Sequence, residues 1–283
     1  MPPASGTFQT NEPNLGEILK DIGNKKIQLP DFQRGWVWDD NRIRALIASV
    51  SQSYPIGAVM TMEVSEGIRF LPRVFEGVEK EPAVQPETLV LDGQQRFTSL
   101  YLSLLSGLPV PTTTEKKKQI DRYYYLDMAQ CLDPDADRFD AVVSVPATKV
   151  ITSDFGRKTD LDLSTPDNEY ENRMYPLNLI YTLSEDAEWK NGFREYFNYD
   201  KDEMKFLGQF EQKIWLPFQQ YKVPVIKLTK DTPKEAVCQV FENVNTGGVS
   251  LTVFELLTST FAADNFQLRQ DWENRKNELK QQN

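Results

Sequence analysis

In the stretch LVLDGQQRFTSL, residues 89–100, a continuous apolar run is followed by a polar turn and then by apolar residues at helical spacing. The apolar run Thr88–Leu91 predicts a short strand, and Asp92-Gly93 predicts a sharp turn. From Gln95 the spacing of apolar residues is typical of a helix that reaches Leu105. The sequence therefore predicts a strand that passes into a helix through a glycine turn.

This strand-to-helix turn is a candidate anion site. The first amides of a helix lack partners and lie at the positive end of its dipole, and Gly93 allows a ligand to approach the backbone. Asp92 is a candidate metal ligand and Arg96 a candidate phosphate contact. The alternative is structural: Asp92 caps the helix and Arg96 forms an ion pair. Neither GxxxxGK[ST] nor GxGxxG occurs in the chain.

A second candidate stretch is LPDFQRGWVW, residues 29–38. Here a predicted strand, 26–29, ends at a proline and a polar turn follows. Gln33 and Arg34 can bind a phosphate, since arginine presents a planar fork of donors. The alternative is that Trp36 and Trp38 are core anchors and that Arg34 packs on an indole ring.

The third stretch is FENVNTGGVSLT, residues 241–252. It predicts two helices joined by a Gly-Gly turn, whose amides can face a ligand together with Asn245. Thr252 and Glu255 have the spacing of a capping box, which explains both without a functional role.

The flanking sequence predicts further helices and strands. Asn14 is expected to cap a helix over 15–22, and Asp39 or Asp40 to begin another. Residues 109–118 carry a proline, threonines and lysines, and are expected to form a surface loop. The remaining expected strands are 58–64, 123–126, 141–145 and 223–228, and the remaining helices are 185–197, 203–221, 233–243, 251–263 and a polar helix from 268.

Composition excludes several functions. The 283 residues include no histidine, so the chain holds no Ser-His-Asp triad and no His-ligated metal. The net charge of −10 argues against a basic DNA-coating protein. Residues 131–210, with 9 basic and 17 acidic side chains, hold −8 of it, so the candidate stretches are nearly neutral. Cys131 and Cys238 are expected to be buried free thiols.

Neither a signal peptide nor an apolar run of about 20 residues is present. The expectation is therefore a protein without membrane contact, in the bacterial cytoplasm.

Taken together, the order PxxQR…W, DGQQR, FxxxNxxGxxLxxxE resembles the domain-of-unknown-function family at the N-terminal half of GmrSD-like type IV restriction enzymes. The resemblance covers about Leu15 to Trp272 and is strongest at residues 91–96. It implies an α+β fold: a ParB- and sulfiredoxin-like mixed α/β unit, 14–108, followed by a mixed, mostly helical region, 109–283, packed on it. It also implies that the chain binds and hydrolyses a nucleoside triphosphate in a phage-defence system.

The resemblance assigns roles by matching position. The implied catalytic residues are Asp92, Gln94, Gln95 and Arg96, and the implied nucleotide- and phosphate-binding residues are Gln33, Arg34, Gly93, Arg96, Thr98, Asn245 and Gly248. The implied cofactors are GTP or ATP and Mg²⁺. Asp92 is the candidate metal ligand, and either Gln94 or Gln95 is the alternative candidate for orienting water.

The chain departs from the complete enzymes, many of which continue into a His-dependent nuclease half. We therefore expect a truncated chain or a protein reduced to this domain, with its nuclease on another domain or subunit. DNA, including modified phage DNA, and a second copy of the chain are the other expected partners. Sulfiredoxin chemistry is not expected, because no cysteine lies beside the DGQQR turn.

Two other functions stay open. One is a non-catalytic DNA-recognition module, for which Lys116–Lys118 is a modest basic candidate. The other is a metal-dependent DNA nickase that uses carboxylates only, such as Asp31, Asp39 and Asp92.

Overall fold

The computed structural model describes residues 8–31, 33–64, 71–232 and 237. Within these residues the larger sheet has six strands in the order β1-β12-β3-β5-β2-β4. The pairs β12–β3 and β2–β5 are parallel and the others antiparallel. The bounds are β1 (Phe8–Asn11), β2 (Ile27–Pro30), β3 (Val59–Glu63), β4 (Pro72–Arg73), β5 (Thr88–Asp92) and β12 (Val225–Leu228).

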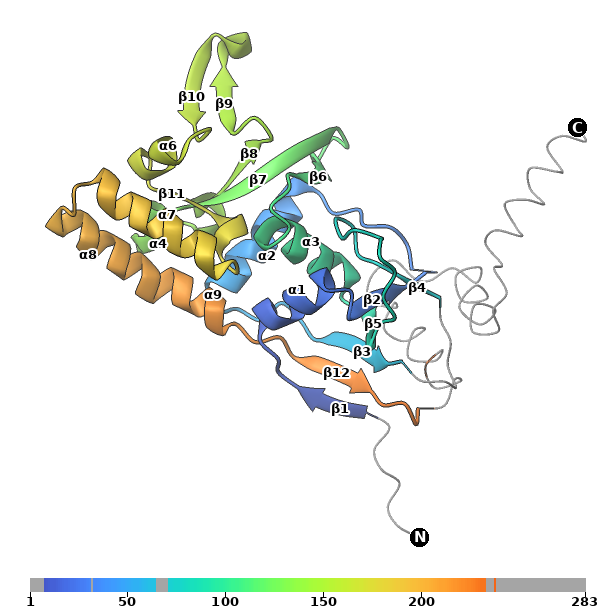
Figure 1. The fold of residues 1–283 in the computed structure, drawn as a ribbon. Helices are drawn as coiled ribbons and strands as arrows, with labels where there is room; N and C mark the ends of the chain where they lie inside the picture. Colours follow the sequence, from blue (N-terminus) through green and yellow to red (C-terminus); the bar gives the residue numbers. More distant parts are fainter. Residues whose placement is uncertain (1–7, 32, 65–70, 233–236, 238–283) are drawn as a thin grey trace, which may run out of the picture.

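Three helices follow strands of this sheet along the chain. Two of them begin at the caps that the sequence predicts. The Asn14 side chain accepts a hydrogen bond from the Gly16 amide at the start of α1 (Leu15–Gly23). Asp39 accepts from the Arg42 amide at the start of α2 (Asp40–Ser51). The third helix, α3 (Gln94–Leu104), follows β5 through Gly93 alone. Helices α1 and α3 lie on the same side of the sheet in Figure 1 and pack against each other.

A smaller sheet follows, built on the long strand β7 (Gln119–Asp127). It contains β6 (Val110–Thr113), β8 (Val142–Pro146) and β11 (Met174–Pro176), each antiparallel to β7. The expectation of a surface loop over 109–118 was therefore wrong for Val110–Thr113. These residues pair with Gln119–Arg122, and burial of Val110 and Thr112 favours the strand despite the prolines.

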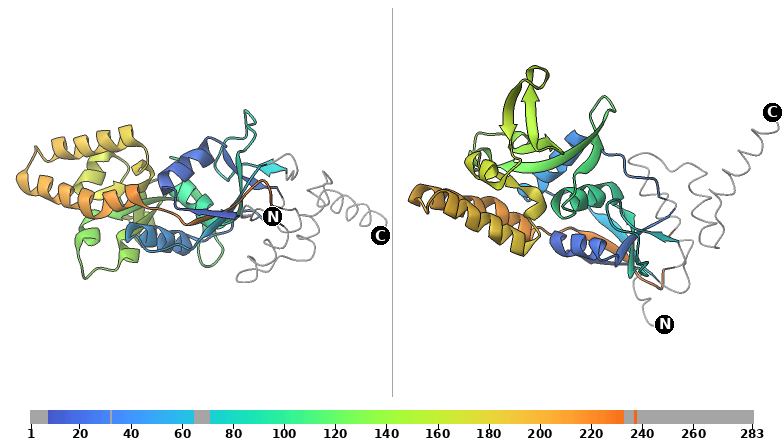
Figure 2. Two further views of the ribbon diagram at one scale, coloured as in Figure 1. Left: turned by 90° about the horizontal axis from the view of Figure 1, so that it is seen from below. Right: turned by 45° about the horizontal axis from the view of Figure 1, so that its top comes forward.

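The strands β9 (Val150–Ser153) and β10 (Lys158–Asp162) form a two-stranded ribbon that projects from the body (Figure 1). Helices α7 (Leu183–Tyr196) and α8 (Lys201–Phe210) lie side by side in all views (Figures 1 and 2). A π-helical turn, Glu211–Trp215, continues α8 into α9 (Leu216–Gln220). Shorter helices are α4 (Met128–Leu132), α5 (Arg138–Ala141) and α6 (Pro166–Glu171), with 3₁₀ turns at Asp154–Gly156 and Leu177–Leu179.

The chain returns to the first sheet at its described end. After α9, strand β12 inserts between β1 and β3. One continuous apolar core joins the two regions, since Leu19 of α1, Phe97 of α3, Leu126 of β7 and Phe218 of α9 belong to the same buried cluster. The boundary expected at residues 108 and 109 stays a prediction, but a strand from beyond it completes the first sheet.

The α+β fold class is confirmed, while the likeness to ParB and sulfiredoxin stays a prediction. The helices expected over 233–243 and 251–263 and from residue 268 lie outside the described residues, apart from Val237. Among the described residues, no helix is both long and apolar enough to cross a membrane.

Candidate functional site

The turn between β5 and α3 depends on Gly93. Its φ is +98°, and it stands at the N-cap of α3, where it has no side chain that could cap the first amides of the helix. A Cβ at this position would lie 2.8 Å from Val59 Cγ2 of β3. Glycine is therefore required by the left-handed backbone and by the close packing of β3. Asp92 does not cap the helix, unlike the structural alternative considered from the sequence.

The two glutamines that follow bind the loop containing Arg34. Gln94 Nε2 donates to the Arg34 carbonyl at 2.7 Å. The Gln95 carboxamide accepts from the Val37 amide at 2.9 Å and donates to the Gly35 carbonyl at 3.2 Å. The Gln95 side chain therefore both accepts from and donates to the loop backbone, as a paired strand does. Together, Gln94 and Gln95 position residues 34–37 at the start of α3.

Arg96 stabilises a different loop. Its guanidinium donates to the carbonyls of Ile56 at 2.7 Å and Ala58 at 3.0 Å. It also lies 2.9 Å from the Asp92 carboxylate, and its side chain is 17% exposed. The ion pair expected in the structural interpretation of Arg96 is therefore present. The hydrogen bonds to Ile56 and Ala58 tie the DGQQR turn to the segment before β3.

Gln33 joins the same site from the loop that follows β2. Its Nε2 donates to the carbonyls of Val90 and Leu91 at 2.8 and 3.0 Å, so the loop is also fixed to β5. Its Oε1 is buried and accepts no hydrogen bond from the described residues. This oxygen is an unused acceptor beside the strand that leads into the turn.

Two residues that sequence reasoning missed complete the support of the loop. Glu76 accepts from the Trp36 amide at 3.1 Å and faces the buried Thr98 hydroxyl at 3.5 Å. Arg73 donates to the Arg34 carbonyl at 3.1 Å and pairs with Glu76 at 3.4 Å. No local pattern in 66–87 signalled this role, because the bonds from Arg73 and Glu76 to Arg34, Trp36 and Thr98 join residues more than 20 positions apart along the chain.

The tryptophans of this loop lie partly in the core, as the structural interpretation expected. Trp36 Nε1 also donates to the Ser99 hydroxyl at 3.0 Å. The Arg34 side chain is exposed and makes no hydrogen bond or ion pair with the described residues. The Arg34 guanidinium is thus available to a ligand.

The structure brings Gln33, Arg34, Gly93, Gln94 and Gln95 together. Arg96 and Asp92 lie at the same turn, and Thr98 points to Glu76. Asn245 and Gly248, with the third motif, lie outside the described residues.

Metal-ligating side chains do not gather in the described part of the chain. No group of three or more Cys, Asp or Glu side chains there is arranged to hold a metal ion. Asp39 is engaged as the cap of α2 and Asp92 pairs with Arg96, so the three carboxylates of the nickase hypothesis do not form one cluster. An Mg²⁺ ion at Asp92 would need phosphate oxygens and water for its other ligands.

Fold and site thus define an α+β domain with an uncapped helix start and an arginine loop fixed beside it. The family model for the N-terminal domain of the GmrSD restriction endonuclease matches residues 15–262, and the chain belongs to this family.

A relative is an uncharacterized protein of Methanocaldococcus jannaschii, 26% identical over 274 residues. The match covers 92% of this chain and 43% of the relative. The chain thus corresponds to less than half of that protein.

Proposed function

We propose that the chain binds a nucleoside triphosphate, GTP or ATP, with Mg²⁺ at the start of α3, and that its hydrolysis controls a modification-dependent, type IV-like restriction system. Family membership supports the restriction context. The geometry of the turn supports the ligand class.

The observation that carries the proposal is the 2.7 Å hydrogen bond from Gln94 to the Arg34 carbonyl. It places an exposed arginine beside the uncapped first turn of a helix. Free amides, the helix dipole and a guanidinium together favour a multiply charged anion, such as a chain of phosphates. The buried Gln33 Oε1 offers an acceptor for a ligand hydroxyl or a water.

The contacts suggest a division of roles within the proposed site. Arg34 and the first amides of α3 hold the phosphates, and charge that develops on the transferred group is stabilised there. Gln94 and Gln95 position the Arg34 loop, because their side chains already bond to it. Asp92 bonds to Arg96 through one carboxylate oxygen, and its other oxygen would hold Mg²⁺, which would supply positive charge to the phosphates. The bound nucleotide supplies the phosphoanhydride bond that is hydrolysed.

DNA is the other partner in this proposal, and its cleavage is assigned to a nuclease domain or subunit other than the described residues. In this proposal the domain acts as a regulator: DNA changes the rate at which the domain hydrolyses the nucleotide and releases phosphate. A second copy of the chain is a further candidate partner.

The test is phosphate release and calorimetric binding with GTP and ATP, with and without Mg²⁺ and modified DNA. We expect Arg34→Ala to weaken nucleotide binding by about tenfold, the loss of one charge-assisted contact. Arg42→Ala is the matched control, because Arg42 is an exposed arginine whose ion pair with Asp39 lies at α2.

Absence of nucleotide binding in the unaltered chain would refute the proposal. DNA binding without any nucleotide effect would favour the DNA-recognition module. Equal losses in Arg34→Ala and Arg42→Ala would show that general charge, rather than this loop, determines binding.

A further inference from the structure

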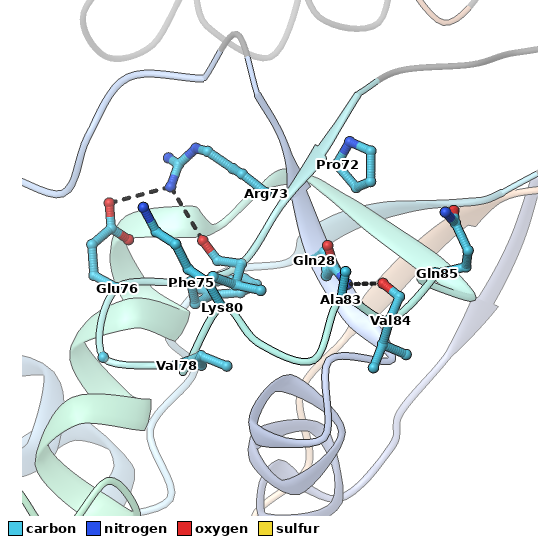
Figure 3. A pocket seen from close by; sticks show the side chains of 12 residues that line it. Gln28, Pro72, Arg73, Phe75, Glu76, Val78, Lys80, Ala83, Val84 and Gln85 are labelled. Atoms are coloured by element: carbon cyan, nitrogen blue, oxygen red, sulfur yellow. Dashed lines mark hydrogen bonds and ion pairs between the residues drawn. The ribbon is translucent and has the colours of Figure 1, made fainter.

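A cavity of about 550 Å³ lies beside the Arg34 loop, between β2, β4 and the segment that follows β4. Its size is in the range of small-molecule sites. Most of its wall is apolar: Pro72, Val74, Phe75, Val78, Ala83 and Val84. Figure 3 shows Pro72, Phe75, Val78, Ala83 and Val84 around the cavity.

The cavity and the candidate phosphate site share residues. Arg73 and Glu76 line the cavity. Arg73 also donates to the Arg34 carbonyl at 3.1 Å, the same oxygen that accepts from Gln94 at the start of α3. A ligand that extends from the helix start past this carbonyl would therefore meet Arg73, which lines the cavity.

The polar groups of the cavity are distributed unequally. Figure 3 shows Arg73, Glu76 and Lys80 at one end and Gln28, Val84 and Gln85 at the other. The end with two cations and one carboxylate is the end that adjoins the Arg34 loop. It suits the phosphate-bearing side of a ligand.

The opposite end offers carboxamides. Gln28 is 3% exposed, and its Nε2 donates to the carbonyls of Lys25 and Val84. Those two bonds fix the amide and leave Oε1 as an acceptor, which accepts no hydrogen bond from the described residues. A cavity with mostly apolar walls and a fixed amide acceptor at one end suits a heteroaromatic ring that carries N–H donors.

We propose that this cavity binds the nucleobase of the nucleoside triphosphate, with the base toward Gln28 and the sugar and phosphates directed past Arg73 to the start of α3. This inference rests on the proposed function and deepens it. It assigns base recognition to the segment 72–85, which lies outside the three motifs. The same cavity thereby distinguishes a nucleotide from free polyphosphate.

Filling the cavity tests the proposal. Val84 is 41% exposed, so Val84→Trp adds a large ring at the wall without disturbing a buried side chain, and the Val84 carbonyl bonded to Gln28 is retained. Ala83→Trp is the second variant. Leu183→Trp is the control, because Leu183 is 62% exposed at the start of α7 and does not line the cavity.

The readout is calorimetric affinity for GTP, for ATP and for inorganic triphosphate, which has no base. We expect Val84→Trp to weaken the binding of the preferred nucleotide by about tenfold or more, the effect of losing the contacts of one base. Binding of triphosphate should change by less than about twofold, and Leu183→Trp should resemble the unaltered chain.

The outcomes separate this inference from the proposed function. If both cavity variants bind nucleotide like the unaltered chain while Arg34→Ala loses it, the cavity inference is wrong and the proposed function stands. If the unaltered chain binds triphosphate and nucleotide with equal affinity, the cavity inference is likewise wrong and the proposed function stands. If the unaltered chain binds neither ligand, both are wrong.

Discussion

The Arg96 guanidinium lies 2.9 Å from the Asp92 carboxylate, across the turn that joins β5 to α3. The same guanidinium donates to the carbonyls of Ile56 and Ala58. Two residues of one sequence motif therefore fix a second loop, about 40 positions earlier, against the start of the helix.

Arg96→Ala should lower the free energy of unfolding by about 2–3 kcal/mol, because charged hydrogen bonds are lost and two carbonyls lose their donor. Urea denaturation measures the change. Arg42→Ala, which removes a solvent-exposed arginine, should cost less than about 1 kcal/mol. A loss for Arg96→Ala no larger than that of the control would contradict the structural role of Arg96.

Gly93→Ala should destabilise the fold by about 2 kcal/mol, through its positive φ and through contact of the new Cβ with Val59. The part of this destabilisation that comes from the contact with Val59 can be measured separately. In a Val59→Ala background the same substitution should cost less, since the side chain that it meets has gone. If the cost is the same in both backgrounds, the close contact with Val59 contributes nothing and backbone strain alone remains.

Gln95→Ala should loosen the Arg34 loop while the global stability changes little. The Val37 amide loses its acceptor, so its hydrogen exchange should accelerate by about tenfold. Gln130→Ala is the control, because the Gln130 side chain bonds to Asp127 at the start of α4. Unchanged exchange at Val37 in Gln95→Ala would show that the loop is held without this carboxamide.

The ion pair between Glu63 of β3 and Lys227 of β12, at 2.8 Å, predicts a pH dependence. The hydrogen bond from Lys227 lowers the pKa of the Glu63 carboxyl below its ordinary value of 4.5, against the opposing effect of burial. Because the pKa is lower in the folded state, the pair stabilises the fold fully above 4.5, and this stability is lost as the pH falls through the folded pKa.

Glu63→Gln should therefore cost about 0.5 kcal/mol near pH 7, a typical value for a partly exposed pair. The difference from the unaltered chain should shrink as the pH falls below 4.5. Denaturation at pH 7 and at successively lower pH values measures it. A difference that is constant with pH would contradict the lowered pKa.

Cys131 should react slowly with thiol reagents in the folded protein. Burial raises the pKa of its thiol to about 12, with Asp127 adding to the shift and Arg138 opposing it, so little thiolate exists at pH 8. In a Cys238→Ser variant, the remaining thiol should react with a disulfide reagent at the rate of unfolding. Reaction at the rate of a free thiol would show that Cys131 is accessible.

Local sequence signals predicted much of the fold. The caps at Asn14 and Asp39 and the glycine turn at Gly93 depend on residues only a few positions apart, which is why they were predictable. Strand β6 was not predicted, because Pro111 and the threonines of this strand are typical of a loop, and only the pairing with β7 favours a strand. Arg73 and Glu76 were missed for a similar reason: their partners in the Arg34 loop are distant in sequence.

The sequence by itself determined the order of strands and helices around the DGQQR turn, the family, and the absence of histidine chemistry. Only the tertiary structure decided what the polar side chains of the turn contact. Gln94, Gln95 and Arg96 bond to carbonyls of residues 34–58, and Arg73 joins their loop to the cavity. The reason is that the orientation of a helix start depends on local backbone conformation, whereas the partners of its side chains depend on how the chain returns to it.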